Sequence, residues 1–166
     1  MNLQAALKSQ YHAGLATLRQ AIERCPDDLW IDGAGQVAFW RVAYHTLFYT
    51  HFYLSTREAD FRPWDQHREE HQYLGTVPQP PHRQPAIGEP YTKAQTLEYW
   101  RQLDAMVNEV VDRLDLDAPD CGFWWYKMPK LDHQIMNIRH LQHHAAILGH
   151  RLRQADSRPP DWFGMA

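Results

Sequence analysis

The fold is decided by residues 137–148, which read N-I-R-H-L-Q-H-H-A-A-I-L. Apolar residues recur there at the three- and four-residue steps that are typical of a helix with one buried face. His140 and His144 are four residues apart, so at about 100° per residue they lie on one face, about 40° apart. We therefore expect a helix from near Leu131 to about Gln154 that points two imidazoles into a helical core.

Three further helices are expected before this one, because Ala and Leu are abundant whereas Val and Ile are scarce. The second runs from about Gly35 to Thr56 and is apolar nearly all round, which is typical of a helix covered by several neighbours or by a second subunit. The third begins at Thr92, which forms a capping-box pattern with Gln95. The first ends before Pro26 and carries an apolar stripe made of Leu3, Leu7, Tyr11, Leu15, Leu18 and Ile22.

A proline-rich connection, residues 57–91, separates the second and third helices. Helices in bundles are usually joined by about two to eight residues. A connection of roughly 35 residues can cross the length of a bundle, so the helices on either side of it can run parallel. No strand is expected, and the class is all-α.

Composition limits the remaining choices. A chain of 166 residues with a hydrophobic fraction of 44% fits one globular domain, residues 1–166, with a short tail from about residue 155. The net charge of −3 gives no basic excess, so neither nucleic acid nor an anionic membrane is an expected partner. No apolar run of about 18 residues and no signal peptide is recognised, and two cysteines cannot build a disulfide framework. The expected location is the cytoplasm.

The histidine pair of the last helix is the main candidate for chemistry, because two imidazoles one turn apart can coordinate one metal ion. The alternative is a pair of buried histidines satisfied by hydrogen bonds, since the H-x-x-x-H pattern is common by chance. A third ligand must come from another helix, where His45 and His51 are available. His45 lies near the middle of its helix, as His140 and His144 do, whereas His51 is about 9 Å further along the axis. His45 is therefore the expected partner.

A second metal motif competes with this one. Residues 67–71, H-R-E-E-H, fit the pattern of inverted zinc peptidases. That chemistry needs both histidines on a packed helix, whereas here the motif follows Pro63 and lies among polar residues. A solvated helical turn is the favoured interpretation. Among the other histidines, His12 is expected at the surface, and His143 is expected either near the site or at an interface, without being a ligand.

Three segments resemble one known family in the order that the family has them. Residues 137–148 resemble the last-helix signature of the DinB-like superfamily, the DNA-damage-inducible bundle proteins. Residues 43–54, A-Y-H-T-L-F-Y-T-H-F-Y-L, are similar to that family's second helix, and residues 90–99 to the opening of its third. The resemblance covers most of the chain except residues 58–89 and the tail.

The resemblance implies a four-helix bundle of up-down-down-up order and a divalent metal ion, zinc, nickel or iron, held by three histidines. The matching positions are His45, His140 and His144. Some members of the family are metal-dependent transferases or isomerases that use a low-molecular-weight thiol, so the implied substrates are a small thiol and an electrophile. In that chemistry the thiol coordinates the metal, loses its proton and attacks the electrophile.

A non-catalytic function is the alternative, namely a metal-stabilised dimeric bundle acting in stress response or binding. No Asp or Glu on either ligand helix is well placed to act as a general base, and Asp132 lies two turns from His140. A homodimer is expected in either case, because the second helix has more apolar surface than one bundle covers.

Overall fold

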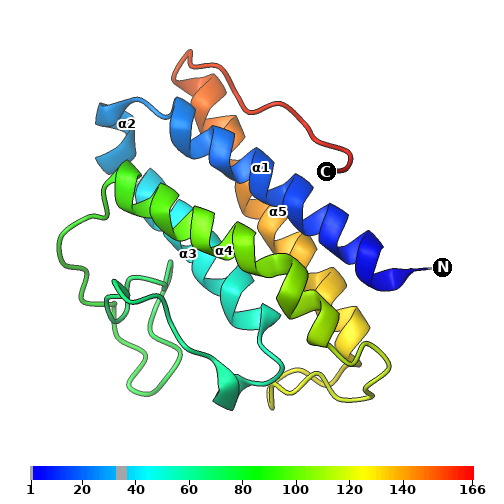
Figure 1. Cartoon of the computed structure of the whole chain (residues 1–166). Coiled ribbons are helices and arrows are strands. Elements are labelled where there is room, and N and C mark those ends of the chain that lie inside the picture. Colours follow the sequence, from blue (N-terminus) through cyan, green and yellow to red (C-terminus); the bar gives the residue numbers. More distant parts are fainter. Residues whose placement is uncertain (1, 33–36) are drawn as a thin grey trace.

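The computed structural model describes residues 2–32 and 37–166 and is all-helical over that part of the chain (Figure 1). A short helix and a single 3-10 turn accompany four long helices. The elements are α1 (Leu3–Arg24), α2 (Asp27–Ile31), α3 (Phe39–Leu54), η1 (Glu58–Asp60), α4 (Lys93–Arg113) and α5 (Lys130–Gln154). None of the helices described here is both long and apolar enough to cross a membrane.

Side-chain caps define where two of the helices begin. The Asn2 side chain accepts a hydrogen bond from the Ala5 amide at the start of α1. At the start of α4, the Thr92 hydroxyl accepts a hydrogen bond from the backbone N–H of Gln95. The side-chain oxygen of Gln95 accepts one from the backbone N–H of Thr92. The predicted capping box is therefore confirmed. These reciprocal bonds satisfy backbone donors that a helix end otherwise leaves free.

The second predicted helix is shorter than expected. The predicted start at Gly35 lies outside the described residues, and α3 begins only after Ala38. It ends at Leu54, because Ser55 adopts an extended backbone with φ −63° and ψ 149°. Sequence periodicity also missed α2, whose five residues are too few to show a helical repeat.

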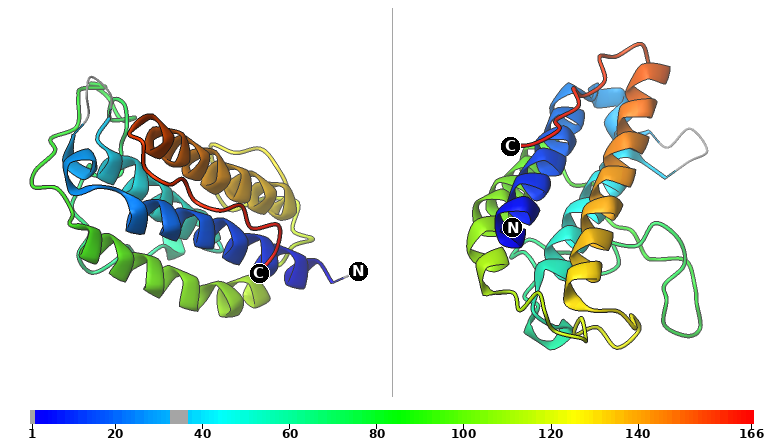
Figure 2. Two further views of the ribbon diagram at one scale, coloured as in Figure 1. Left: turned by 90° about the horizontal axis from the view of Figure 1, so that it is seen from above. Right: turned by 90° about the vertical axis from the view of Figure 1, so that its right-hand side faces the viewer.

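The four long helices pack around a common core (Figures 1 and 2). Both α1 and α3 contact α4 on one side and α5 on the other. The buried core residues come from all four helices and include Leu15, Leu47, Leu103 and Leu148. The pair of α3 and α5 matters most for function, because these two helices carry the candidate histidines.

The long connection covers the apolar face of α3 that faces away from the core. Trp64 and Tyr91, one from each end of the connection, are buried and pack with Tyr44 of α3. His67 adds a contact of 2.6 Å between its Nδ1 and the Tyr44 hydroxyl. The all-round apolar character of α3 is thus explained by the chain's own connection, so it gives no argument for a second subunit.

Candidate metal centre

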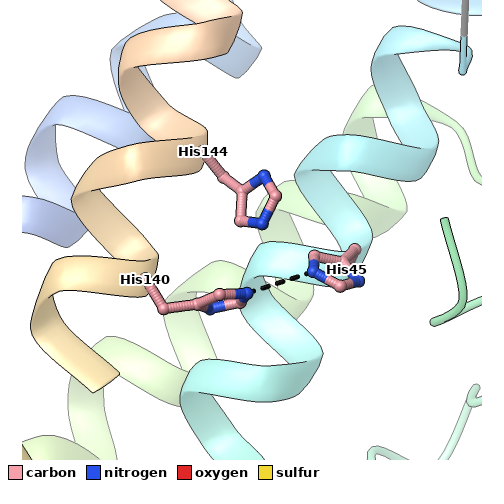
Figure 3. A group of neighbouring side chains, drawn as sticks. All are labelled: His45, His140 and His144. Carbon is pink, nitrogen blue, oxygen red and sulfur yellow. Dashed lines mark hydrogen bonds between the residues drawn. The ribbon is translucent and has the colours of Figure 1, made fainter. Parts of the chain in front are cut away.

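Three imidazoles meet between α3 and α5 (Figure 3). His140 and His144 project from successive turns of α5 toward His45 of α3. One nitrogen from each ring lies within 4.8 Å of the nitrogens of the other two, and the Nε2 atoms of His45 and His140 are 3.1 Å apart. The structure therefore brings together the three residues selected from the sequence, and this group could hold a metal ion.

The positions follow from helical geometry. The four-residue spacing puts His140 and His144 on the same face of α5, directed at α3. His45 lies close to the middle of α3, and the two histidines of α5 lie close to the middle of that helix. Helices that pack along their length bring their middles to one level whether they run parallel or antiparallel, so His45 meets the pair.

Burial keeps these rings neutral. It lowers the pKa of His45 and of His140 from 6.5 to about 4, and that of His144 to about 3. Neighbouring imidazoles lower the pKa values further, because a second positive charge at this spacing is unfavourable. A neutral imidazole has a free lone pair, which is the form that binds a metal ion.

The hydrogen bonds of the three rings differ. The Nδ1 of His45 donates to the backbone oxygen of Gln72 over 2.6 Å, so its Nε2 carries the lone pair and faces the Nε2 of His140 at a hydrogen-bond distance of 3.1 Å. The Nδ1 atoms of His140 and His144 are buried without a partner among the described residues. Within that part of the chain, His144 makes no hydrogen bond through either ring nitrogen. A buried polar atom without a partner costs about 1–3 kcal/mol, so hydrogen bonding accounts for the contact of His45 with His140 but not for the position of His144.

Three imidazole nitrogens are a donor set that fits zinc and other divalent transition metals. Nε2 coordination by His45 is compatible with its bond to Gln72, since metal-bound histidines usually donate their second ring N–H to a carbonyl or carboxylate. No carboxylate or thiol belongs to the group, so a hard ion such as Mg²⁺ is a poor match.

A surface pocket of about 600 Å³ adjoins the group on α5, and His140 is part of its wall. Its other lining residues are Met136, Arg139, Gln142, His143 and Ala146. The predicted position of His143 near the site agrees with this, since its ring contacts His144 with centroids 5.0 Å apart. Of the three candidate ligands, only His140 lines this pocket.

His51 lies apart from the three-histidine group. Its Nδ1 lies 3.0 Å from the Tyr99 hydroxyl, and its ring packs edge-on against Phe61. It does not belong to the three-histidine group. The preference for His45 therefore agrees with the structure, and the physical reason is the displacement along the helix axis.

The H-x-x-E-H segment contains no helix, so the expected helical turn there is wrong. Residues 67–71 form turns and short coil. His71 is only 3% exposed and contacts the backbone oxygens of Glu69 and Glu89, which is also contrary to a solvated segment. Glu70 is paired with Arg83. Neither histidine belongs to the group of described residues that could hold a metal ion.

Two local contacts were not anticipated from the sequence. The Nδ1 of His12 lies 2.7 Å from an Asp104 carboxylate oxygen, so this ring links α1 to α4 and is not simply at the surface. The ring of Tyr49 lies beside two of the candidate ligands, with centroids 4.7 Å from His45 and 5.9 Å from His140. The four-residue step from His45 to Tyr49 was a signal for this second contact.

Comparisons with known proteins identify no relative: no family model, no curated protein and no solved structure matches the chain. The chemical argument therefore depends on the geometry of this chain alone.

Proposed function

We propose that the protein binds one divalent transition-metal ion through His45, His140 and His144. The observation that carries the proposal is the His144 imidazole, which is neutral and lies among two other imidazoles without a hydrogen bond in the described part of the chain. Histidines that serve only the core are expected to be hydrogen-bonded. A shared metal ion supplies the partner that hydrogen bonding does not.

We further propose that the four long helices form a four-helix bundle of up-down-down-up order, as in the DinB-like superfamily. The courses of the helices support this order: α1 and α5 run from lower right to upper left in Figure 1, whereas α3 and α4 run the opposite way. The long connection between α3 and α4 allows these two neighbours to be parallel. The family assignment itself has only the sequence resemblance as support.

The activity we propose is metal-dependent transfer of a low-molecular-weight thiol to an electrophile. A divalent ion held by three neutral imidazoles has open positions and keeps its full charge, so it lowers the pKa of a bound thiol. The chain contributes by holding the nitrogen lone pairs of the three imidazoles close together, where one ion can bind them. Gln72 fixes the orientation of the His45 ring, and the low pKa values prevent protons from competing for the nitrogens.

Cobalt substitution tests this function. Co²⁺ in a three-imidazole site absorbs visible light, and binding of a thiolate adds a sulfur-to-metal charge-transfer band. We expect the purified protein loaded with Co²⁺ to gain this band when mercaptopropanol is added, and we expect His140→Ala to show neither spectrum. A protein that binds Co²⁺ but never develops the thiolate band would rule out the thiol chemistry while leaving metal binding intact.

A non-catalytic, metal-stabilised protein is the second candidate. It is favoured by the absence of any carboxylate from both the three-histidine group and the wall of the adjoining pocket. A transferase that uses water or an alcohol as nucleophile needs a general base. A thiol needs less assistance because its pKa is already near 8.5. The cobalt experiment separates the two candidates.

The homodimer and the cytoplasmic location stay predictions. The surface that supports a dimer is an apolar groove of about 340 Å³ between α1 and α5, whose lining includes Ile135, which is 46% exposed, and also Arg139. We expect light scattering at micromolar concentration to give a mass of about twice the 19.6 kDa of one chain. A mass of one chain under these conditions would contradict the dimer.

A further inference from the structure

The pocket beside His140 contains one permanent charge, the guanidinium of Arg139. The side chain of Arg139 forms no ion pair or hydrogen bond with any residue that the structure describes. Most other arginines of the described chain are bonded to a carboxylate or to a backbone oxygen, for example Arg24 to Asp161 and Arg83 to Glu70. An exposed arginine beside a pocket, with its five N–H donors unused, is well suited to bind an anionic group.

The rest of the pocket wall points to the same kind of ligand. It contains no acidic residue, and Gln142 and His143 add further polar groups close to Arg139. Met136 and Ala146 supply apolar surface for a short carbon skeleton. A divalent ion held by three neutral histidines would add two positive charges nearby, which strengthens the preference for an anion.

Arg139 is also a neighbour of a candidate ligand on α5. Arg139 directly precedes His140, and both residues line the pocket, so one small molecule can contact the guanidinium and also reach the ion that His140 is proposed to hold. An arginine side chain binds a carboxylate through two parallel N–H donors, which selects planar anions over neutral groups of similar size.

We propose that this pocket is the substrate subsite of the metal centre and that it accepts a small thiol carrying a carboxylate, with the Arg139 guanidinium binding the carboxylate. The inference rests on the proposed function, because the thiol end of the ligand is assigned to the metal. It adds the substrate class and the specificity-determining residue. Arg139 is a binding residue here and takes no part in holding the metal.

The test compares two probes of similar length, mercaptopropionate and mercaptopropanol, by titrating each into the Co²⁺-loaded protein and following the thiolate band. We expect the wild type to bind mercaptopropionate about tenfold more tightly than mercaptopropanol, because a charge-assisted bidentate contact distinguishes them. Arg139→Gln should bind both probes equally, Arg139→Lys should keep part of the preference, and all variants should hold the same amount of cobalt.

Arg153→Gln is the matched control, because Arg153 is an exposed arginine of the same helix that is also unpaired in the described chain and does not line the pocket. It should keep the wild-type preference. An equal preference for mercaptopropionate in wild type and Arg139→Gln would overturn the inference, since the carboxylate would then bind elsewhere or chelate the ion directly. A wild type without any thiolate band would instead reject the proposed function, and the subsite with it.

Discussion

A chelator added at about pH 7.5 is expected to lower the melting temperature of the purified protein by on the order of 10 °C. A ligand that binds only the folded state at about a thousand times its Kd stabilises that state by about 4 kcal/mol. In a chain of this length each kcal/mol corresponds to about 2–4 °C. Differential scanning calorimetry with and without chelator measures the effect.

Substitutions show whether the effect comes from the proposed ligands. His45→Ala should remove most of the chelator-induced shift, because His45 is the only ligand that α3 supplies. His51→Ala is the control from the same helix, with its ring bonded to Tyr99 and outside the group. Its melting temperature should fall through lost packing, but the chelator-induced shift should remain. Loss of the shift in His51→Ala and its retention in His45→Ala would contradict the assignment.

The same shift should depend steeply on pH. The pKa values of His45 and His140 are about 4 and that of His144 about 3 when folded, against about 6.5 in the unfolded chain. Between these values the unfolded chain binds more protons, so stability is fully present above about pH 6.5 and is lost as pH falls toward 4. Protons compete with the metal at the three nitrogens only as the pH approaches these folded-state pKa values, so the chelator-induced shift should persist near pH 5 and become much smaller at about pH 3. An equal shift at about pH 7.5 and about pH 3 would contradict the three-histidine site.

Much of the fold could be predicted because its helices carry strong local signals. The stripe of α1, the capping box of Thr92 and the period of α5 each determine an element without reference to the rest of the chain. The start of α3 had no such signal, since Ala38 gives no side-chain cap. The path of the connection was also hidden, because the contact of Trp64 and Tyr91 with Tyr44 joins residues that no periodic pattern relates.

Of the candidate site, only the three metal ligands could be predicted from the sequence. The four-residue spacing on α5 selected His140 and His144, and the position of His45 near the middle of α3 selected the third ligand. Both arguments use helix geometry alone. The backbone oxygen of Gln72 that orients His45 lies in the connection, and a carbonyl carries no side-chain signature in a sequence. The H-x-x-E-H segment misleads for a related reason, because His67 contacts Tyr44 of α3 and His71 contacts backbone oxygens of the connection.

His144→Ala should leave the protein with almost no bound divalent metal. Two imidazoles remain, and a site of two neutral ligands binds transition metals far more weakly than a site of three. His150→Ala is the matched control, because His150 is an exposed histidine of the same helix outside the group. It should keep the wild-type metal content. His67→Ala should also keep it, because His67 contacts Tyr44 and not the three histidines.

Elemental analysis of the purified wild type, His144→Ala and His150→Ala tests the central claim most directly. We expect about one divalent ion per chain in the wild type and in His150→Ala, and close to none in His144→Ala. Equal metal content in all three proteins, or a wild type that stays free of metal after incubation with zinc, nickel or iron, would contradict a metal centre formed by His45, His140 and His144.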